Sequence, residues 1–467
     1  MTAQGEQTAG AERRPRPVWL RVASGGVVAL LVAVAAIYAW RADGQPVHDV
    51  ALTDGGIWVS GGRTGYWGRV NTGAHELDLV VQGAGRSGNG EGVVRPDVLQ
   101  DGRQAIGVTA DRQLVAIDTR TGEPVRDDSG TVETVQMPEP HWATGQDFQR
   151  PDLVALGGDT LAFVDHDTGR IVGTRLDPEG GSSIGELAEV GPLDTVGPRA
   201  SITVDDDGDI MAVSAQSGRV VEIPATGDGF GTPKRTSLGF TGRAADITAV
   251  GDAWVVLDLE TGKVMSEGLE EPQALPASNE EAGQSLVVAT LQQPGPASHV
   301  VAYSTVESAG YMRIDSDSDG GNEGEILSGI DEDSGAAGAT GGSRSRFNRI
   351  SRPALNGPCL YAAWGEGGTI RWGRTCTQDK RSTVELPTEG EQTRRNGVAV
   401  RQARGQLVLN DLDTGRVFDL SLPDDVRIDT WPGGAPRDEI ERYEPTPWGR
   451  PTTSSPTTSP TTATKTG

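Results

Sequence analysis

The residues best suited to chemistry are four acidic side chains on a short, glycine-containing stretch. Asp315, Asp317, Asp319 and Glu323 occupy positions 1, 3, 5 and 9 of this stretch, and Gly320 occupies position 6. Oxygen ligands at this spacing, with a glycine for the sharp turn, can surround one Ca²⁺ ion. Position 12 holds Ile326 instead of the glutamate of an EF-hand. The stretch is therefore a candidate calcium loop of another kind, and the alternative is a solvated acidic loop.

No other group of residues predicts a reaction. The five histidines stand singly at His48, His75, His141, His166 and His299, without the spacing of a metal site. The sequence has no phosphate-binding loop, no dinucleotide fingerprint on a βαβ unit and no G-x-S-x-G in an α/β setting. We therefore expect a protein without catalytic residues and without a required cofactor, calcium being the one candidate ligand.

A repeated sequence motif, called the phrase below, predicts the strands of this chain. Val255–Met265 reads as a short apolar strand, a tight Thr-Gly turn and a return strand, with Gly262 free to take the positive φ of the turn. The same phrase recurs along the chain, and its turn glycines are Gly73, Gly122, Gly169, Gly218, Gly262 and Gly415. The first five lie 44 to 49 residues apart, which is the repeat length of a β-propeller blade.

The spacing predicts how many blades there are. The 153 residues between Gly262 and Gly415 leave room for two further units, around Asp319-Gly320 and around the hairpin from Cys359 to Cys376. Eight candidate units result. The sequence therefore predicts an all-β fold, a seven- or eight-bladed β-propeller over residues 47–431. Two β-sandwiches joined end to end are the alternative, but sandwich strands would not repeat one turn phrase at a fixed period.

The N-terminus predicts a membrane protein. Residues 22–40 contain no charge over 19 positions and follow four arginines, so we expect a transmembrane anchor after a cytoplasmic, disordered tail at 1–21 and before a stalk at 41–46. A cleaved signal peptide is the alternative. The bulk of the chain would then lie outside the cell. Its net charge of −25 argues against a nucleic-acid partner.

Three further features fit an exported chain. Cys359 and Cys376 lie on two expected strands, and if Trp364 pairs with Thr369 a small shift brings their sulfurs together, so we expect a disulfide. Residues 316–347 are rich in Gly, Ser, Asp and Glu and read as a flexible acidic insert. Residues 432–467 are rich in Pro, Thr and Ser and read as a linker or tail.

Two of these motifs resemble known propellers. The acidic stretch from Asp315 resembles the D-x-D-x-D-G-x-x-D loops of integrin-type propellers, which implies calcium. The phrase D-x-x-T-G-x-V resembles the quinoprotein-like propellers, which implies that fold. The quinone-dependent dehydrogenases of that group carry a tryptophan at the end of the phrase, where this chain has Val125, Val172, Val221 and Met265. The resemblance thus supports the fold and counts against the enzyme.

The layout as a whole is similar to the N-terminal part of large actinobacterial surface proteins. In those proteins a membrane-anchored propeller-like region precedes a linker and fibronectin type III or other immunoglobulin-like domains. The resemblance implies a non-enzymatic binding or scaffold module on the cell surface, whose partner is a protein, a peptide or a cell-wall polymer. The alternatives are a propeller enzyme, such as a quinoprotein-like dehydrogenase or a lyase with acidic residues around the centre, and an assembly factor for a membrane complex.

Overall fold

The structure is a computed structural model. It describes residues 56–62, 65–83, 96–127, 129–137, 152–177, 184–188, 190–227, 229–275, 288–306, 308–315, 327–328, 350–366, 369–376, 379–387, 397–403, 405–421, 426–428 and 431. These residues belong to one compact unit that begins at Thr53. The predicted anchor and the tail lie outside them. Among the described residues, no helix has the length and apolar character needed to cross a bilayer.

The described chain is built from eight antiparallel sheets, numbered here in chain order. The first four contain β1 (Ile57–Ser60), β2 (Tyr66–Asn71) and β3 (Glu76–Gln82) in sheet 1; β4 (Asp97–Gln100), β5 (Ala105–Val108), β6 (Gln113–Asp118), β7 (Glu123–Pro124) and β8 (Thr134–Gln136) in sheet 2; β9 (Val154–Gly157), β10 (Thr160–Val164), β11 (Arg170–Arg175) and β12 (Asp194–Thr195) in sheet 3; and β13 (Ala200–Val204), β14 (Ile210–Ser214), β15 (Arg219–Ile223) and β18 (Lys234–Ser237) in sheet 4.

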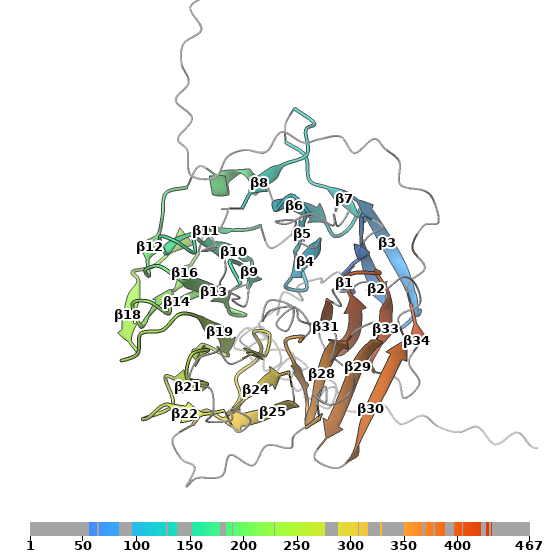
Figure 1. Cartoon of the computed structure of the whole chain (residues 1–467). Helices are drawn as coiled ribbons and strands as arrows, with labels where there is room; N and C mark the ends of the chain where they lie inside the picture. The colour runs from blue at the N-terminus through green and yellow to red at the C-terminus, as the bar shows by residue number, and fades with distance from the viewer. Residues whose placement is uncertain are drawn as a thin grey trace, which may run out of the picture. The chain divides into compact units, whose positions relative to one another are not determined.

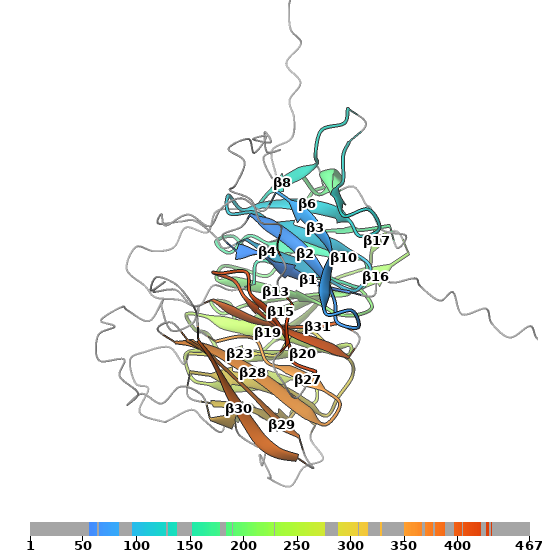
Figure 2. The same cartoon turned by 90° about the vertical axis from the view of Figure 1, so that its right-hand side faces the viewer.

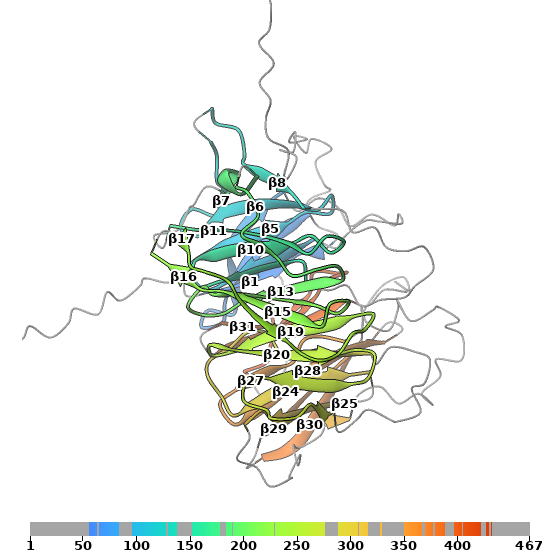
Figure 3. The same cartoon turned by 90° about the vertical axis from the view of Figure 1, so that its left-hand side faces the viewer.

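The remaining sheets follow the same plan. They contain β19 (Ala245–Val250), β20 (Ala253–Asp258), β21 (Lys263–Ser266) and β22 (Gln273–Ala274) in sheet 5; β23 (Ala289–Leu291), β24 (Val300–Thr305), β25 (Ser308–Arg313) and β26 (Leu327–Ser328) in sheet 6; β27 (Ala354–Asn356), β28 (Cys359–Glu366), β29 (Thr369–Cys376) and β30 (Asp379–Pro387) in sheet 7; and β31 (Val398–Ala403), β32 (Gln406–Asp411), β33 (Val417–Asp419) and β34 (Val426–Arg427) in sheet 8. A small hairpin of β16 (Ala225–Thr226) and β17 (Gly229–Phe230) lies at the rim (Figure 3), and a 3₁₀ turn, η2, spans Gly185–Ala188.

The sheets form a ring around a common centre. The first strand of each sheet is innermost, and β1, β4, β9, β13 and β19 contact one another in turn (Figure 1). The ring closes because β31 and β32 of sheet 8 contact β1 of sheet 1. Sheets arranged radially in this way are those of a β-propeller. The all-β fold expected from the repeat is therefore confirmed, and the alternative of two joined sandwiches is wrong.

Packing between neighbouring sheets explains the sequence of the strands. Each sheet is covered on both faces, so its middle strands are apolar at successive positions instead of at alternate ones. Every residue of β10 and of β14 is buried, for example. Separate hydrophobic clusters fill the spaces between neighbours, such as the one that joins Ile171 of sheet 3 to Ile202 and Val221 of sheet 4. The core is thus a series of wedges, one between each pair of sheets.

The repeated turns have a common geometry. The N–H of the turn glycine donates to the carbonyl four residues earlier at Gly122, Gly169, Gly218, Gly262 and Gly415, and each of these glycines has a φ between +58° and +76°. Four of the five turns join the second and third strands of a sheet. The turn at Gly122 instead joins β6 to β7, the third and fourth strands of sheet 2. The assumption of one uniform unit is therefore wrong for sheet 2.

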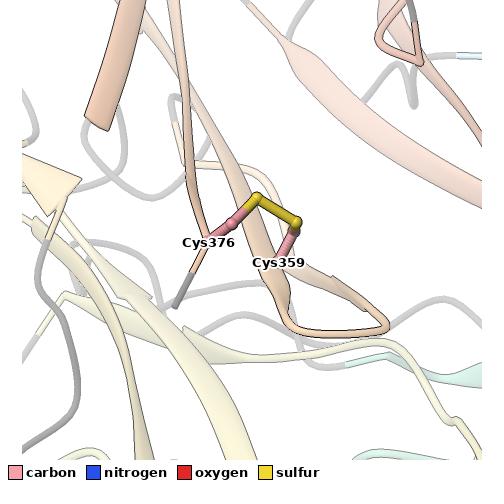
Figure 4. The surroundings of a disulfide bond; sticks show 2 residues. All are labelled: Cys359 and Cys376. Carbon is pink, nitrogen blue, oxygen red and sulfur yellow. A yellow bond between two sulfur atoms is a disulfide. The ribbon is translucent and has the colours of Figure 1, made fainter. Parts of the chain in front are cut away.

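Sheet 7 contains the cysteines, and its register differs from the expected one. Trp364 pairs with Arg371, not with Thr369, because the turn is two residues shorter than expected. Cys359 is then directly opposite Cys376, and the two are joined by a disulfide with Cα atoms 4.1 Å apart (Figure 4). Figure 2 shows the three long strands of this sheet, β28, β29 and β30, in orange and brown.

One strand lies within the predicted acidic insert. Leu327–Ser328 forms β26 and pairs with Ser308 and Ala309 of β25. The insert predicted for residues 316–347 therefore contributes to sheet 6, whereas the sequence suggested no strand there. A dipeptide strand is too short to show the period of two on which strand prediction depends.

Substitution of a turn glycine tests the close packing of the turns. A Cβ on Gly218 would lie 1.7 Å from the carbonyl oxygen of Phe240. We expect Gly218→Ala to lower the free energy of unfolding by about 3 kcal/mol, from a left-handed φ and from the clash. Gly130→Ala is the matched control, because Gly130 also has a positive φ but no atom within 4 Å of the added Cβ. Equal losses for the two variants in chemical denaturation would contradict the packing argument.

Removal of the disulfide tests its contribution to stability. The disulfide joins two cysteines that are 17 residues apart in the sequence. We expect the double variant Cys359→Ala/Cys376→Ala to lose about 2–4 kcal/mol in chemical denaturation because the unfolded chain gains freedom. A reducing agent should lower the stability of the parent protein by the same amount and leave the variant unchanged. An effect of the reducing agent on the variant would show that another process is responsible.

Candidate functional site

Five charged residues meet at the centre of the ring, and we call them the central cluster. They are Asp97 at the start of β4, Asp152 just before β9, Asp246 in β19, Arg352 just before β27 and Arg401 in β31. All five belong to the innermost strands or to the residues that lead into them. The ring therefore brings together residues up to 304 positions apart in the sequence.

Arg352 connects the largest number of sheets. Its Nη2 lies 2.7 Å from Asp152 Oδ2 and 2.6 Å from Asp246 Oδ1, and its Nη1 donates to the carbonyl oxygens of Leu291 and Gln292 at 3.0 and 3.2 Å. Arg352 leads into sheet 7, whereas these partners belong to sheets 3, 5 and 6. Sheets 3 and 7 stand on opposite sides of a ring of eight. One guanidinium thus joins four sheets across the centre.

Asp246 is the buried end of this connection. Only 3% of its side chain is exposed. Its Oδ2 also accepts hydrogen bonds from the N–H of Leu291 at 2.8 Å and from Thr290 Oγ1 at 3.1 Å. A buried carboxylate requires a cation and hydrogen bonds to offset the loss of water, and Asp246 has both. Its side chain therefore fixes sheet 6 and sheet 7 relative to sheet 5.

Arg401 connects the end of the ring to its beginning. Its Nη1 donates to the carbonyl of Val98 at 3.0 Å, and its Nη2 contacts Asp97. Its Nε donates to Asn410 Oδ1 at 3.2 Å. Asn410 in turn exchanges two hydrogen bonds of 2.9 Å with the backbone of Ser60 in β1. Sheet 8 is thereby bonded to both sheet 1 and sheet 2 by buried polar groups.

The electrostatics of the cluster follow from its enclosure. The surrounding protein displaces water from the Asp152 carboxylate and raises its pKa, although half of the side-chain surface is exposed; Arg352 opposes this rise, and the nearby carboxylates of Asp246 and Asp97 add to it. Burial by itself would lower the pKa of Arg352, but Asp152 and Asp246 outweigh it and raise that pKa. The cluster holds three carboxylates against two guanidinium groups. An excess of negative charge therefore remains at the centre.

Two members of the cluster are open to solvent. The side chains of Asp97 and Asp152 are 41% and 51% exposed, whereas those of Arg401 and Arg352 are 7% and 18% exposed. Each open carboxylate is thus held by an enclosed arginine. Such carboxylates are fixed in direction and can accept hydrogen bonds from a ligand, but proton transfer at neutral pH would work against the attached guanidinium.

A second acidic group lies on the turns between the first and second strands of sheets 2 to 4. Its members are Asp101, Asp159, Asp205, Asp206, Asp207 and Asp209. Asp159 N–H donates to Asp101 Oδ2 at 3.1 Å, and Arg103 bonds Asp159 Oδ2 at 2.6 Å. Asp205 Oδ1 accepts from the N–H groups of Asp207 and Asp209. Within the described residues, no three acidic, histidine or cysteine side chains converge well enough to hold a metal ion.

The predicted calcium loop is described only at its first residue. Asp315 bonds Arg313 through both carboxylate oxygens, at 3.0 and 2.7 Å, and Arg313 lowers the pKa of Asp315. His299 Nδ1 is 3.3 Å from the same carboxylate. Asp317, Asp319 and Glu323 lie outside the described residues. Both carboxylate oxygens of Asp315 are thus bonded to the Arg313 guanidinium.

The central cluster was not found from the sequence. Asp97, Asp152 and Asp246 are three of 66 acidic residues, and nothing in their spacing distinguishes them. One signal was available in part. Four of the five cluster residues stand at or near the start of the first strand of their unit, and Arg401 lies in the middle of β31, so an alignment of the repeats would have placed polar residues where apolar ones are usual.

Comparisons with known proteins found solved structures that are similar to this chain at low sequence identity. No family model and no curated protein sequence matches the chain. Similar solved structures include BamB from Moraxella catarrhalis, with a TM-score of 0.43 and 16% identity over 82% of this chain and 94% of that one. A streptogramin B lyase has a TM-score of 0.41 and 13% identity, over 68% and 90% of the two chains. The Cps50 (Swd1) propeller domain of Myceliophteria thermophila has a TM-score of 0.39 and 11% identity, over 68% of this chain and 93% of that one.

Removal of Arg352 tests the connection across the centre. We expect Arg352→Met to cost about 3–5 kcal/mol of unfolding free energy, because Asp246 is left buried without its cation. Arg313→Met, which removes the exposed pair with Asp315, should cost at most about 1 kcal/mol. The double variant Arg352→Met/Asp246→Leu should recover part of the loss. Chemical denaturation measures all three, and equal costs for the two single variants would contradict the argument.

Titration of Asp205 should make stability depend on pH. Burial raises the pKa of Asp205 to about 6, above its usual value, so the unfolded chain loses this proton first as the pH rises. The loss of stability caused by the buried, charged carboxylate is absent below about pH 4 and complete above about pH 6. We expect Asp205→Asn, which keeps the Oδ1 acceptor, to be more stable than the parent by about 1–3 kcal/mol at pH 8 and equal to it at pH 4. A constant difference across this range of pH would refute the assignment.

Proposed function

We propose that this chain is a non-enzymatic binding or scaffold module that works outside the cytoplasm. In this proposal the eight sheets are eight propeller blades, anchored at the cell membrane by residues 22–40. The ring presents its faces to a protein, a peptide or a cell-wall polymer. No cofactor is required.

One observation carries the proposal: the charges at the centre of the ring are used to hold the ring together. Arg352 joins four sheets, and Arg401 joins the last sheet to the first two. In a propeller enzyme the same position would need charged groups that are free to bind and to transfer protons. A centre that is internally paired instead favours a rigid frame for recognition.

The described surface indicates the kind of contact. Among the residues whose side chains the structure describes, Val190 is the only large hydrophobic one that is exposed. Surfaces that bind through apolar patches expose several such residues together. We therefore propose recognition through polar and charged groups. The chain carries 66 acidic and 41 basic residues, so a neutral or basic partner is favoured over an acidic one.

Two features support the location. The disulfide between Cys359 and Cys376 is typical of proteins that fold in an oxidising compartment. The predicted anchor at residues 22–40 would place the ring outside the membrane, with the N-terminus in the cytoplasm. We propose a single-pass membrane protein on this basis.

The test combines location and binding. A protease added to intact cells should cleave the ring while leaving an epitope at the N-terminus intact. The full chain, purified in detergent, should then bind to one fraction of the cell envelope, either the wall polymer or a membrane protein complex. Capture by an assembling membrane complex would favour the assembly-factor alternative. Protection from the protease, or saturable binding to neither fraction, would overturn the proposal.

An enzyme remains the second candidate because of one residue. Asp152 is half-exposed at the centre of the ring, and loss of water around its carboxylate and its acidic neighbours raise its pKa more than Arg352 lowers it. Those are properties of a general acid. Turnover of a dehydrogenase or lyase substrate by the purified protein, lost in Asp152→Asn but kept in Asp315→Asn, would establish the enzyme and displace the scaffold.

A further inference from the structure

Sheet 1 lacks the outermost strand that every other sheet of the described chain has. Sheets 2 to 8 end in β7, β12, β18, β22, β26, β30 and β34, respectively, whereas sheet 1 ends in β3. β3 is seven residues long, and five of the other seven outermost strands are only two residues long. Among these outer strands only β30, with nine residues, is longer than β3. A long strand is therefore the one without a neighbouring strand in the described chain.

The backbone groups at this edge can be assigned. Gly83 N–H donates to the carbonyl of Gly65, and these two residues continue the register in which Tyr66 pairs with Gln82. Hydrogen-bonded and non-hydrogen-bonded pairs alternate in an antiparallel ladder. Leu79, Val81 and Gly83 therefore bond to β2, and Val80 and Gln82 direct their N–H and C=O groups outward. In the described part of the chain, no hydrogen bond reaches the backbone of Val80 or Gln82.

The edge carries few of the features that block pairing. Protected edges contain proline, lysine or unpaired charges. β3 has no proline and no lysine, and Asp78 is neutralised by a bidentate pair with Arg69 at 2.9 and 3.0 Å. The register shift between β2 and β3 falls between Arg69 and Val70 of β2, opposite Leu79 and Leu77 of β3, so Leu79–Gln82 pairs without interruption.

The outward groups are self-complementary. A two-fold axis through Val81 would place Val80 of one copy opposite Gln82 of the other, and the two outward residues of each chain would exchange four backbone hydrogen bonds. Val81 would then face Val81, and Leu79 would face Gly83. No like charges oppose each other over these positions, and the three-stranded sheets of the two copies would join into one of six strands.

We propose that two copies of this chain associate through the edge of β3, which has no neighbouring strand among the described residues. The contact lies at the rim, so both faces of each ring stay available to other partners. Each copy carries a net charge of −25, so the copies repel at low ionic strength. Association should therefore strengthen with added salt, which screens this repulsion, whereas a contact made of ion pairs would weaken.

Cross-linking tests the contact at one position. Val81 pairs with itself across the proposed axis, at the closely spaced type of position that a disulfide can bridge. We expect the full chain with Val81→Cys, in detergent, to form a covalent dimer under mild oxidation. Val59→Cys is the matched control, because Val59 is also a buried valine of sheet 1 but lies on the innermost strand. It should stay monomeric.

A second variant separates the edge from a general tendency to associate. Val80→Pro removes one outward N–H and leaves the bonds of Leu79 and Val81 to β2 in place. We expect it to abolish the cross-link of Val81→Cys and to halve the mass measured by light scattering, with an unchanged near-UV circular dichroism spectrum. A parent protein that is monomeric at all salt concentrations, or a cross-link that survives Val80→Pro, would overturn the proposal. Neither result depends on which ligand the ring binds.

Discussion

A ring made of separate sheets has to be closed, and in this protein charge pairing at the centre joins sheets that are not neighbours. Neighbouring sheets are in contact, and sheet 8 also meets sheet 1 through an apolar cluster. Arg352 bonds groups of sheets 3, 5 and 6 from its place before sheet 7, and Arg401 bonds sheets 1 and 2 through Asn410, Val98 and Asp97. Buried ion pairs add little to net stability, but leaving one member alone is costly. They therefore specify one arrangement of the sheets over others.

The seams of the ring combine apolar and polar contacts in different proportions. Consecutive sheets pack through apolar clusters, such as the one formed by Ile171, Ile202 and Val221, to which buried hydrogen bonds such as that between Ser201 and Ala245 are added. Between sheet 8 and sheet 1 the contact combines a smaller apolar cluster with the buried hydrogen bonds of Asn410 and Ser60. His75 in the turn before β3 also lies 3.6 Å from the buried Asp419 of β33. Polar groups fix direction where apolar groups fix only proximity, which suits the one seam that chain connectivity does not enforce.

Much of the fold could be predicted from the sequence, and the site could not. The Thr-Gly turns revealed the repeat because five of the six turn glycines adopt a left-handed φ, and a local requirement leaves a local signal. Gly73 is the exception, since in its turn the positive φ is at His75. Gly122 shows the limit of this signal, since the same turn serves a different pair of strands in sheet 2. The central cluster depends on residues such as Asp152 and Arg352, which are 200 positions apart. Their meeting is a property of the closed ring, and no spacing in the sequence records it.

The distance between Asp152 and Arg352 along the chain has a consequence for synthesis. A chain made from its N-terminus presents Asp152 and Asp246 long before Arg352 has been added. Sheets 3 to 6 can assemble their apolar wedges during that interval, while both carboxylates stay hydrated and without their cation. The cation that pairs with both carboxylates is added only with residue 352, and Arg401 follows after sheet 7. The order of translation therefore places the acidic members of the central cluster in the chain before its basic members.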